Sequence, residues 1–291
     1  MTAAYERDTS QLLADFVGLA YEQFQTGNPQ VTLPQGWTQT ASFLAPEIDF
    51  GRLVATPAMT AAAEQLDPVA MRAAGLAAGV RDVPFGFAAR GPAFDVIVLR
   101  GTRTAEEVVI DLTGVQVPVP VLWDLKLAKV HLGFLILFGF LYAQLQAAAR
   151  ALGNTRPLLF GGHSLGSALA TLGALAVNQQ VFSGAGASGL IQLYAFASPR
   201  VGDPTFQGAY DAAVPGSFRI TNLADVVPVL PPTSISVAGT TFRYAHVGRE
   251  WSYLWQTGDV EGNHSLADNY QPAVLQEVET DAPRTYPTSG L

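Results

Sequence analysis

The chain has 291 residues, of which 49% are hydrophobic and 14% charged, and its formal net charge is −8 at pH 7. This composition excludes a disordered protein and is sufficient for one large α/β domain or two small ones. The sequence has no lysine- and arginine-rich run that would bind nucleic acid, and the lack of cysteine excludes thiol nucleophiles, disulfides and cysteine-bound metals.

The start of the chain and its longest apolar stretch bear on location. Met1–Asp8 lacks the basic start and the apolar core of a secretory signal. The apolar stretch Leu132–Leu145 is shorter than the about 20 residues that span a bilayer, so a buried helix is expected there. The sequence therefore favours a soluble protein, either cytoplasmic or non-classically secreted; the alternative is a secreted chain whose signal has been removed, which would have the same start.

The N-terminal region is predicted to be helical. Apolar residues recur at helical spacing from Thr9 to Phe24, and Gly27-Asn28-Pro29 is expected to end that helix. A second helical stretch, rich in alanine, is expected at Pro57–Ala78. Residues 1–82 are interpreted as a helical segment that packs on the domain that follows.

Strands and helices alternate from Val83 onward. Strands are expected at Val83–Ala89, Ala93–Leu99, Val108–Leu112, Pro157–Phe160, Leu190–Ala197 and Ser217–Asn222, and a final pair at Thr240–Val247 and Trp251–Trp255. Helices are expected at His131–Leu152 and Leu165–Asn178. Continuous apolar strands that alternate with helices predict an α/β fold, with a mainly parallel central sheet and helices on both faces.

Residues 162–166, Gly-His-Ser-Leu-Gly, have the G-x-S-x-G pattern of a nucleophile at a sharp strand-to-helix turn. The pattern is a weak signal alone, but an apolar strand precedes it and a helix of small residues follows it. Ser164 is therefore the predicted nucleophile. The alternative is a glycine-rich turn with an incidental serine; a phosphate loop is disfavoured because no G-x-G-x-x-G pattern accompanies the turn.

A serine nucleophile needs a base, and the chain has four histidines. His163 is adjacent to the serine, and the turn is expected to direct its side chain away from the serine hydroxyl. His131 precedes the serine in the chain, against the order serine, acid, histidine that is usual in hydrolases with this turn. His246 lies in an expected strand. His264 remains, in a loop after the last expected strand.

The acid that orients the base is expected after the second strand that follows the nucleophile strand. Asp225 directly follows the expected strand Ser217–Asn222 and is the predicted acid. Asp203, which follows the preceding strand, is the alternative.

Acyl transfer also requires hydrogen-bond donors for the developing oxyanion. The backbone N–H of Leu165 is one candidate, and Thr102, after the strand Ala93–Leu99, is the other. An ordinary strand-end turn at Thr102 is the alternative. The apolar, proline-containing segment at about 103–129 is either a lid over the site or ordinary core.

Seven short segments resemble the class 3 (fungal-type) triacylglycerol lipases, a family with the α/β-hydrolase fold. They are Val98–Thr102, Val130–Phe134, Gly162–Gly166, Phe196–Asp203, Arg219–Pro228, Tyr244–Trp251 and Asn263–His264. The resemblance covers about residues 83–270. It departs from the family at Asp111-Leu112, where an Asp-Trp pair is usual.

The resemblance implies Ser164, Asp225 and His264 as the catalytic triad, and Thr102 and Leu165 as the oxyanion donors. It implies a cofactor-free ester hydrolase of the lipase type, acting on acylglycerols or related lipid esters, with a lid at about 103–129. The alternatives are a short-chain or phenolic-ester esterase, a phospholipase, or a non-catalytic lipid-binding protein.

The expected organisation is one domain with three parts, and its partners are small molecules. Residues 1–82 precede a catalytic core at 83–270, and a tail follows at 271–291. The expected partners are a lipid or ester substrate and, transiently, a lipid–water interface. The negative net charge of the protein favours a neutral substrate over an anionic one. No nucleic acid, metal or other cofactor is expected.

Overall fold

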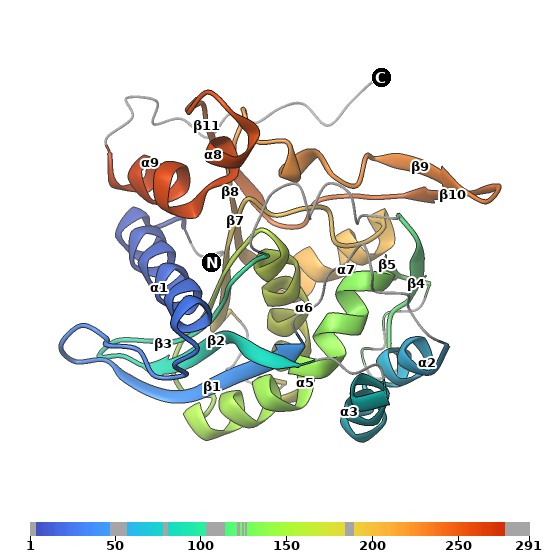
Figure 1. Cartoon of the computed structure of the whole chain (residues 1–291), viewed down its shortest axis with the longest axis horizontal. Coiled ribbons are helices and arrows are strands. Elements are labelled where there is room, and N and C mark those ends of the chain that lie inside the picture. Colours follow the sequence, from blue (N-terminus) through green and yellow to red (C-terminus); the bar gives the residue numbers. More distant parts are fainter. Residues whose placement is uncertain are drawn as a thin grey trace.

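The computed structural model describes residues 4–46, 57–77, 81–102, 114–120, 123, 125, 127–183 and 189–276. Within these residues, seven strands form a central sheet in the order β1-β2-β3-β6-β7-β8-β11 (Figure 1). The strands are β1 (Thr38–Pro46), β2 (Asp82–Arg90), β3 (Asp95–Leu99), β6 (Leu158–His163), β7 (Ile191–Phe196), β8 (Gly216–Asn222) and β11 (Arg249–Tyr253). The strands from β3 to β11 are parallel and the β1-β2-β3 edge is antiparallel. The predicted mainly parallel sheet is confirmed.

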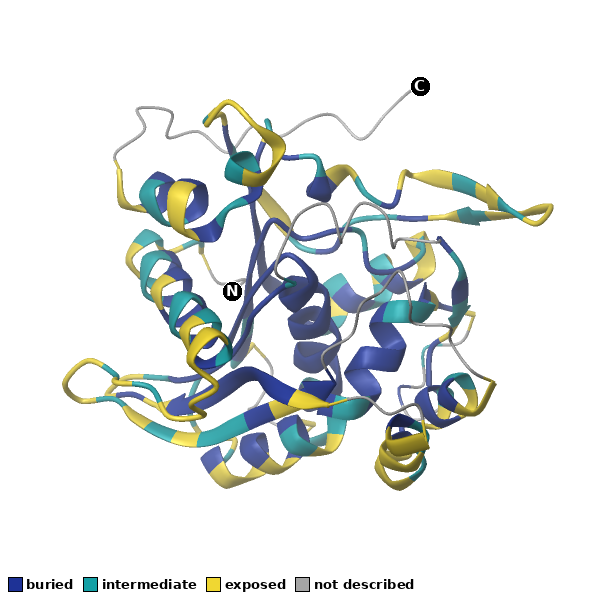
Figure 2. Cartoon of the chain, viewed as in Figure 1, coloured by how far each residue is buried: buried dark blue, intermediate teal, exposed yellow. Residues whose placement is uncertain are grey.

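Helices cover both faces of this sheet (Figure 1). On one face lie α1 (Arg7–Thr26), the single turn Leu266–Tyr270 and α9 (Gln271–Leu275). On the other face lie α2 (Pro57–Gln65), α3 (Pro68–Ala77), α5 (Leu132–Leu152), α6 (Leu165–Gln180) and α7 (Pro204–Ala213). Each face has its own cluster of buried apolar side chains, and α5 and α6 are buried along most of their length (Figure 2).

The small residues of α6 explain how closely that helix approaches the sheet. A methyl group added at Gly173 would lie 3.1 Å from the ring of Phe160 on β6, so there is little space for a larger side chain. The first helix follows from its amphipathic pattern: Leu13, Phe16 and Val17 are fully buried, and Gly27, with φ 68°, ends it.

One helix in the described part of the chain, α5, is long and apolar enough to cross a membrane by length and composition. The apolar stretch Leu132–Leu145 is the first part of this helix, which has 21 residues and ends at Leu152, as expected from the sequence. In the structure α5 packs against α6, α2 and β1, and 61% of its most apolar window is buried. The expectation of a buried helix is confirmed.

The interpretation of residues 1–82 as purely helical is wrong. β1 pairs with β2 and forms an edge of the central sheet. Its residues were not recognised because Thr38–Pro46 alternates only weakly between apolar and polar side chains. The stretch Pro57–Ala78 is also divided, because Leu66 has a φ of 49° and Pro68 begins a new helix.

The expected final strand pair is wrong as well. β10 (Thr240–Arg243) pairs with β9 (Ser234–Val237) in a hairpin that projects from the sheet (Figure 1), whereas β11 joins β8 in parallel. Gly248, with a φ of 72°, provides the turn before β11. His246 accordingly lies outside the strands, and the start of the expected tail 271–291 is α9, with Ala273 and Val274 buried.

The predicted lid at 103–129 is described only in part, and the expected strand Val108–Leu112 and the Asp111-Leu112 pair lie outside the described residues. Within the described part, β4 (Gln116–Pro118) pairs with β5 (Lys129–His131). Trp123 is buried against Phe138 of α5, with ring centroids 5.8 Å apart, while Leu127 is 87% exposed. This segment therefore has both core-like and exposed positions.

Candidate active site

Ser164 lies at a sharp turn between β6 and α6. Its φ of 57° and ψ of −127° are unusual for a residue with a side chain. The neighbouring glycines allow this turn, because a methyl group at Gly162 would lie 2.4 Å from the carbonyl oxygen of Gly166. The turn directs the Ser164 hydroxyl to the edge of the sheet where the parallel strands end.

His264 and Asp225 meet Ser164 at this edge. His264 Nε2 lies 2.8 Å from Ser164 Oγ, and His264 Nδ1 lies 2.8 Å from Asp225 Oδ2. All three residues are buried. Because the carboxylate accepts from the Nδ1–H group, Nε2 is free to accept the proton of the serine hydroxyl. His264 was expected in a loop but is the last residue of the short helix α8 (Val260–His264). The structure thus brings together three residues from separate segments in the arrangement that acyl transfer requires.

Further donors orient the Asp225 carboxylate. The backbone N–H of Val227 donates to Oδ1 over 2.9 Å, and the Tyr270 hydroxyl donates to Oδ2 over 2.7 Å. Burial and the nearby carboxylate raise the pKa of Tyr270 well above its usual value, so the phenol keeps its proton. With His264, three donors converge on one carboxylate.

The other candidates from the sequence lie elsewhere. Asp203 accepts from the backbone N–H of Phe206 at the start of α7 over 2.7 Å and acts as a helix cap. His246 donates from Nε2 to the carbonyl oxygen of Pro228, 2.7 Å away. His131 is buried, and neither ring nitrogen has a hydrogen-bond partner within the described part of the chain.

The predicted oxyanion donors belong to two segments that meet at Ser164. Leu165 is the first residue of α6. The end of β3 packs directly on the turn: a methyl group at Gly101 would lie 2.8 Å from Ser164 Cβ, and one at Gly166 would lie 2.5 Å from the carbonyl oxygen of Arg100. Thr102 therefore follows a residue that touches the serine.

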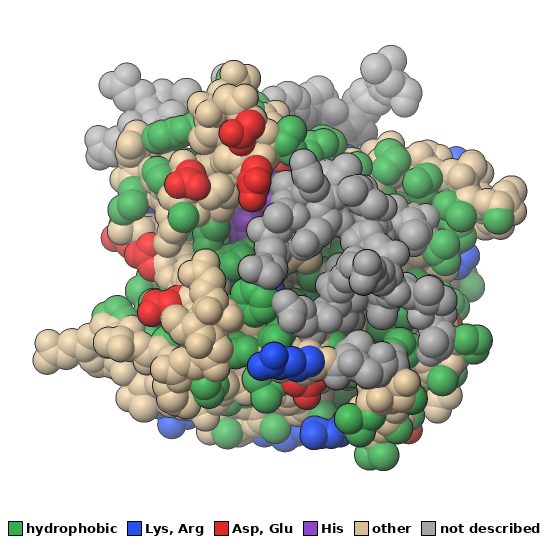
Figure 3. Space-filling view, viewed as in Figure 1, with side chains coloured by type: hydrophobic (Ala, Val, Ile, Leu, Met, Phe, Trp, Pro, Cys, Tyr) green, Lys and Arg blue, Asp and Glu red, His purple; other side chains and the backbone are tan. Residues whose placement is uncertain are grey.

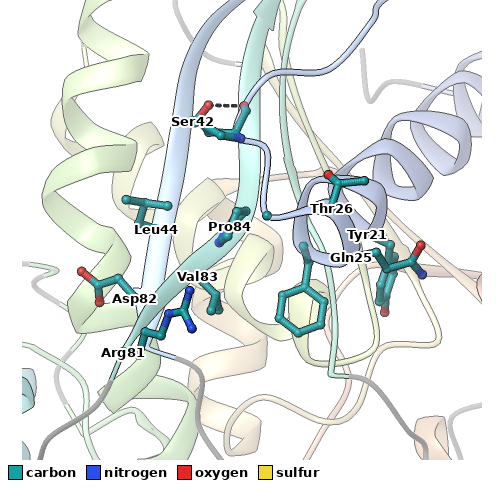
Figure 4. A pocket seen from close by; sticks show the side chains of 12 residues that line it. Tyr21, Gln25, Thr26, Ser42, Leu44, Arg81, Asp82, Val83 and Pro84 are labelled. Carbon is teal, nitrogen blue, oxygen red and sulfur yellow. Dashed lines mark hydrogen bonds between the residues drawn. The ribbon is translucent and has the colours of Figure 1, made fainter.

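A cavity of about 390 Å³ opens at His264 and Thr102. The charged carboxylate side chains among its described lining residues are Glu22 and Glu261. On the face of the molecule shown in Figure 3, acidic side chains gather beside a histidine, with hydrophobic side chains around them. A larger cavity of about 850 Å³ lies beside the end of α1 (Figure 4), and Tyr21 and Gln25 line both cavities.

Three residues near the site were missed in the sequence. The His163 ring was expected to point elsewhere, yet it lies against the His264 ring, with centroids 4.8 Å apart. Tyr21 hydrogen-bonds His163, and Tyr270 hydrogen-bonds Asp225. Of these three residues, only His163 had a local signal in the sequence, because it is next to Ser164. Both tyrosines reach the site from distant helical segments.

Residues 96–235 match the model of the family "Lipase (class 3)". The matched region contains Thr102, Ser164 and Asp225, and His264 lies beyond it. This region of the chain, residues 96–235, is thus similar to the class 3 lipases.

Individual lipases are similar to parts of the chain. A lipase from Rhizomucor miehei is 35% identical over 158 residues, which are 53% of this chain and 40% of that protein. The secreted mono- and diacylglycerol lipase 1 from Fusarium solani is 32% identical over 142 residues, 48% of this chain and 38% of that protein. The chain thus spans about two fifths of the length of these curated relatives.

The solved structure of the Rhizomucor miehei lipase propeptide complex has the same fold. Its TM-score is 0.61 at 23% sequence identity, and the match covers 86% of this chain and 70% of that one. The predicted α/β-hydrolase fold is confirmed.

The expectation of a cytoplasmic or non-classically secreted protein is wrong. Relatives from Fusarium solani and Penicillium cyclopium are named as secreted lipases and point to extracellular secretion. The expectation rested on the composition of the first residues, which in the sequence given do not decide whether a protein is exported.

Proposed function

We propose that the protein hydrolyses carboxylic ester bonds of acylglycerols or related lipid esters through an acyl-enzyme formed on Ser164. The observation that carries this proposal is the pair of 2.8 Å contacts from His264 to Ser164 and Asp225 at a strained strand-to-helix turn. A serine hydroxyl is a poor nucleophile until a base accepts its proton, and this arrangement provides the base and the group that orients it.

The proposed reaction has two steps. His264 accepts the Ser164 proton as Oγ attacks the ester carbonyl carbon, and Asp225 stabilises the imidazolium that forms. The N–H groups of Thr102 and Leu165 stabilise the oxyanion. His264 then donates the proton to the leaving alcohol. A water molecule, deprotonated by the same histidine, attacks the acyl-enzyme, releases the fatty acid and restores the serine.

Apolar side chains around the site support a lipid substrate. Leu223 precedes Asp225 by two residues, Val260 precedes His264 by four, and Leu254 follows β11. Each of these side chains is more than half exposed. Because they lie on or beside the segments that carry the acid and the base, we propose that these side chains contact the lipid–water interface transiently. We also propose that the segment at about 103–129 acts as the lid.

We also propose that the chain works as one catalytic domain. α1 contacts β2, β3 and β6 of the central sheet, and α9 packs against α1. The segments before residue 83 and after residue 270 therefore share the core of the sheet that carries Ser164.

Substitution of Ser164 tests the function. Ser164→Ala removes the hydroxyl that forms the acyl-enzyme, so kcat for p-nitrophenyl butyrate is expected to fall about 10⁴-fold or more. Ser217→Ala, which alters another buried serine bonded to Tyr210, is the matched control and is expected to retain activity. A fluorophosphonate probe should label Ser164 of the parent protein, and peptide mapping would identify the labelled residue.

The outcomes separate the alternatives. A parent protein that the probe does not label and that does not cleave esters would be a lipid-binding protein instead of an enzyme. Rates on emulsified long-chain triacylglycerol, phospholipid and soluble short-chain esters would then distinguish a lipase from a phospholipase or an esterase. A hydrolysis rate that increases once the substrate concentration exceeds the solubility limit would support the lid.

A further inference from the structure

A partly buried network of hydrogen bonds joins α1 to both halves of the proposed site. The backbone N–H of Gly101, next to Thr102, donates to Tyr21 Oη over 3.0 Å. Tyr21 Oη lies 2.8 Å from His163 Nδ1, and His163 Nε2 lies 2.9 Å from the backbone carbonyl oxygen of His264. These hydrogen bonds thus connect the Gly101–Thr102 turn to the backbone of His264.

With a neutral His163 ring, only one arrangement of protons fits these hydrogen bonds. The Gly101 N–H group can only donate and the His264 carbonyl can only accept. Tyr21 therefore donates its proton to His163 Nδ1, and His163 Nε2–H donates to the carbonyl. Burial lowers the pKa of His163 well below its usual value, so the ring is neutral, and burial raises the pKa of Tyr21 to about 12, so the phenol keeps its proton.

The same ring packs on the base. The His163 and His264 ring centroids are 4.8 Å apart, and Tyr270, which bonds Asp225, packs edge-on against His163 at 5.6 Å. A neutral His163 ring allows His264 to become an imidazolium during the reaction, whereas a second positive charge at this distance would oppose it.

A close contact at Gly101 links these hydrogen bonds to the nucleophile Ser164. A methyl group there would lie 2.6 Å from Tyr21 Oη and 2.8 Å from Ser164 Cβ. A small shift of the Tyr21 hydroxyl would therefore move the turn that holds Thr102 relative to the serine. Misplacement of catalytic groups by about 1 Å is enough to reduce rates strongly.

We propose that Tyr21 and His163 are positioning residues, which hold the Gly101–Thr102 turn and the backbone of His264 at a fixed separation around Ser164. The inference rests on the proposed function. It makes α1, which lies outside the residues matched by the family model, a part of the catalytic unit. If these residues only provided hydrogen-bond partners for one another, their substitution would lower the stability of the protein without a selective loss of turnover.

Tyr21→Phe tests the proposal. It removes one hydroxyl and leaves the Gly101 N–H and His163 Nδ1 without that partner. We expect kcat for p-nitrophenyl butyrate to fall between 10- and 100-fold while KM changes less than twofold, because the turn positions groups that act in the transition state. Tyr210→Phe is the matched control: its buried hydroxyl bonds Ser217 on β8, and its removal should leave kcat within twofold.

A second pair of variants separates position from folding. His163→Gln keeps an N–H donor for the His264 carbonyl, whereas His163→Leu keeps none. We expect the glutamine variant to retain at least tenfold more kcat than the leucine variant when both are folded with similar Tm values. Rates of phosphonylation of Ser164 should follow the same order.

The results that would overturn the inference are distinct from those that would overturn the function. An active parent enzyme whose Tyr21→Phe variant keeps its kcat, or changes only in KM, removes the positioning role and leaves the hydrolase intact. Equal losses in Tyr21→Phe and Tyr210→Phe would have the same meaning, as would equal kcat values for the two His163 variants. A parent protein without esterase activity would overturn both proposals.

Discussion

At the scale of single residues, the site depends on one strained backbone conformation. Ser164 has positive φ, which costs on the order of 1–3 kcal/mol in a residue with a side chain. The N–H of Ser164 donates to the Phe196 carbonyl over 2.9 Å, and the glycines beside it leave room for the turn. The neighbouring strand and helix therefore maintain a conformation that an isolated peptide would not adopt.

His131 provides a residue-scale prediction for acid stability. Burial lowers its pKa to about 4, so the folded protein does not bind a proton that the unfolded chain accepts near pH 6.5. Stability is therefore expected to fall as the pH drops from about 6.5 toward 4, by roughly 1.4 kcal/mol per pH unit for this residue. Urea unfolding at pH 7.5 and pH 5 measures this change.

The matched variant for that measurement is His131→Leu. Leucine fills a similar space beside the Phe134 ring, whose centroid is 4.5 Å from that of His131, and it does not titrate. Between pH 7.5 and pH 5, the free energy of unfolding of the variant should fall by about 2 kcal/mol less than that of the parent. His163 and His246, whose pKa values burial also lowers, contribute equally to both proteins. An unchanged pH dependence would show that His131 is not the group responsible.

At the scale of elements, the approach of α6 to β3 decides the geometry of the nucleophile. A methyl group at Gly166 would lie 2.3 Å from the Leu99 carbonyl oxygen, so the helix and the strand cannot both keep their positions around a larger residue. Because the added methyl group meets a backbone oxygen, no side-chain rotation relieves the contact.

Gly166→Ala is therefore expected to destabilise the protein by about 1–3 kcal/mol and to lower kcat, as the added methyl group moves the start of α6 and the Leu165 N–H. Gly208→Ala on α7 is the control, since nothing lies within 4 Å of the added methyl group. That variant should be stabilised by roughly 0.5–1 kcal/mol, as expected for alanine in place of glycine within a helix. Chemical denaturation and ester hydrolysis of both variants would measure the difference, and a Gly166→Ala enzyme as active as the parent would contradict the packing argument.

At the scale of the whole molecule, charge is expected to influence which lipid surfaces the protein attacks. The formal net charge is −8, and Glu22 and Glu261 line the cavity at His264. Both glutamates are exposed, so their effect is long-range and screened by salt.

The expected outcome is slower hydrolysis of neutral ester substrate in vesicles that contain anionic lipid than in neutral vesicles. Replacing both residues (Glu22→Gln and Glu261→Gln) should narrow the ratio of the two rates by about two- to fivefold, the range for exposed charges. The difference should disappear in about 1 M salt, where the screening length is about 3 Å. Equal ratios for parent and variant at low salt would show that these carboxylates do not face the lipid.

Much of the fold was predictable because the pattern is local. β6, the turn at Ser164 and α6 occupy consecutive residues, and apolar strand, glycines and small-residue helix are all visible in that order. The strand β1 was not predictable, because it is recognised as a strand through its pairing with β2 rather than through its own alternation. The separation of β10 from β11 likewise depends on which neighbour each strand finds.

The amino-acid sequence alone determined the α/β class, the turn that presents Ser164, and Asp225 and His264 as candidates, because each depends on residue types in a short stretch or on their order along the chain. Only the tertiary structure decided that Tyr21 meets His163 across 142 positions of sequence and that Tyr270 meets Asp225 across 45. Such partners are selected by how distant helices pack on a shared sheet, and no local periodicity records that choice.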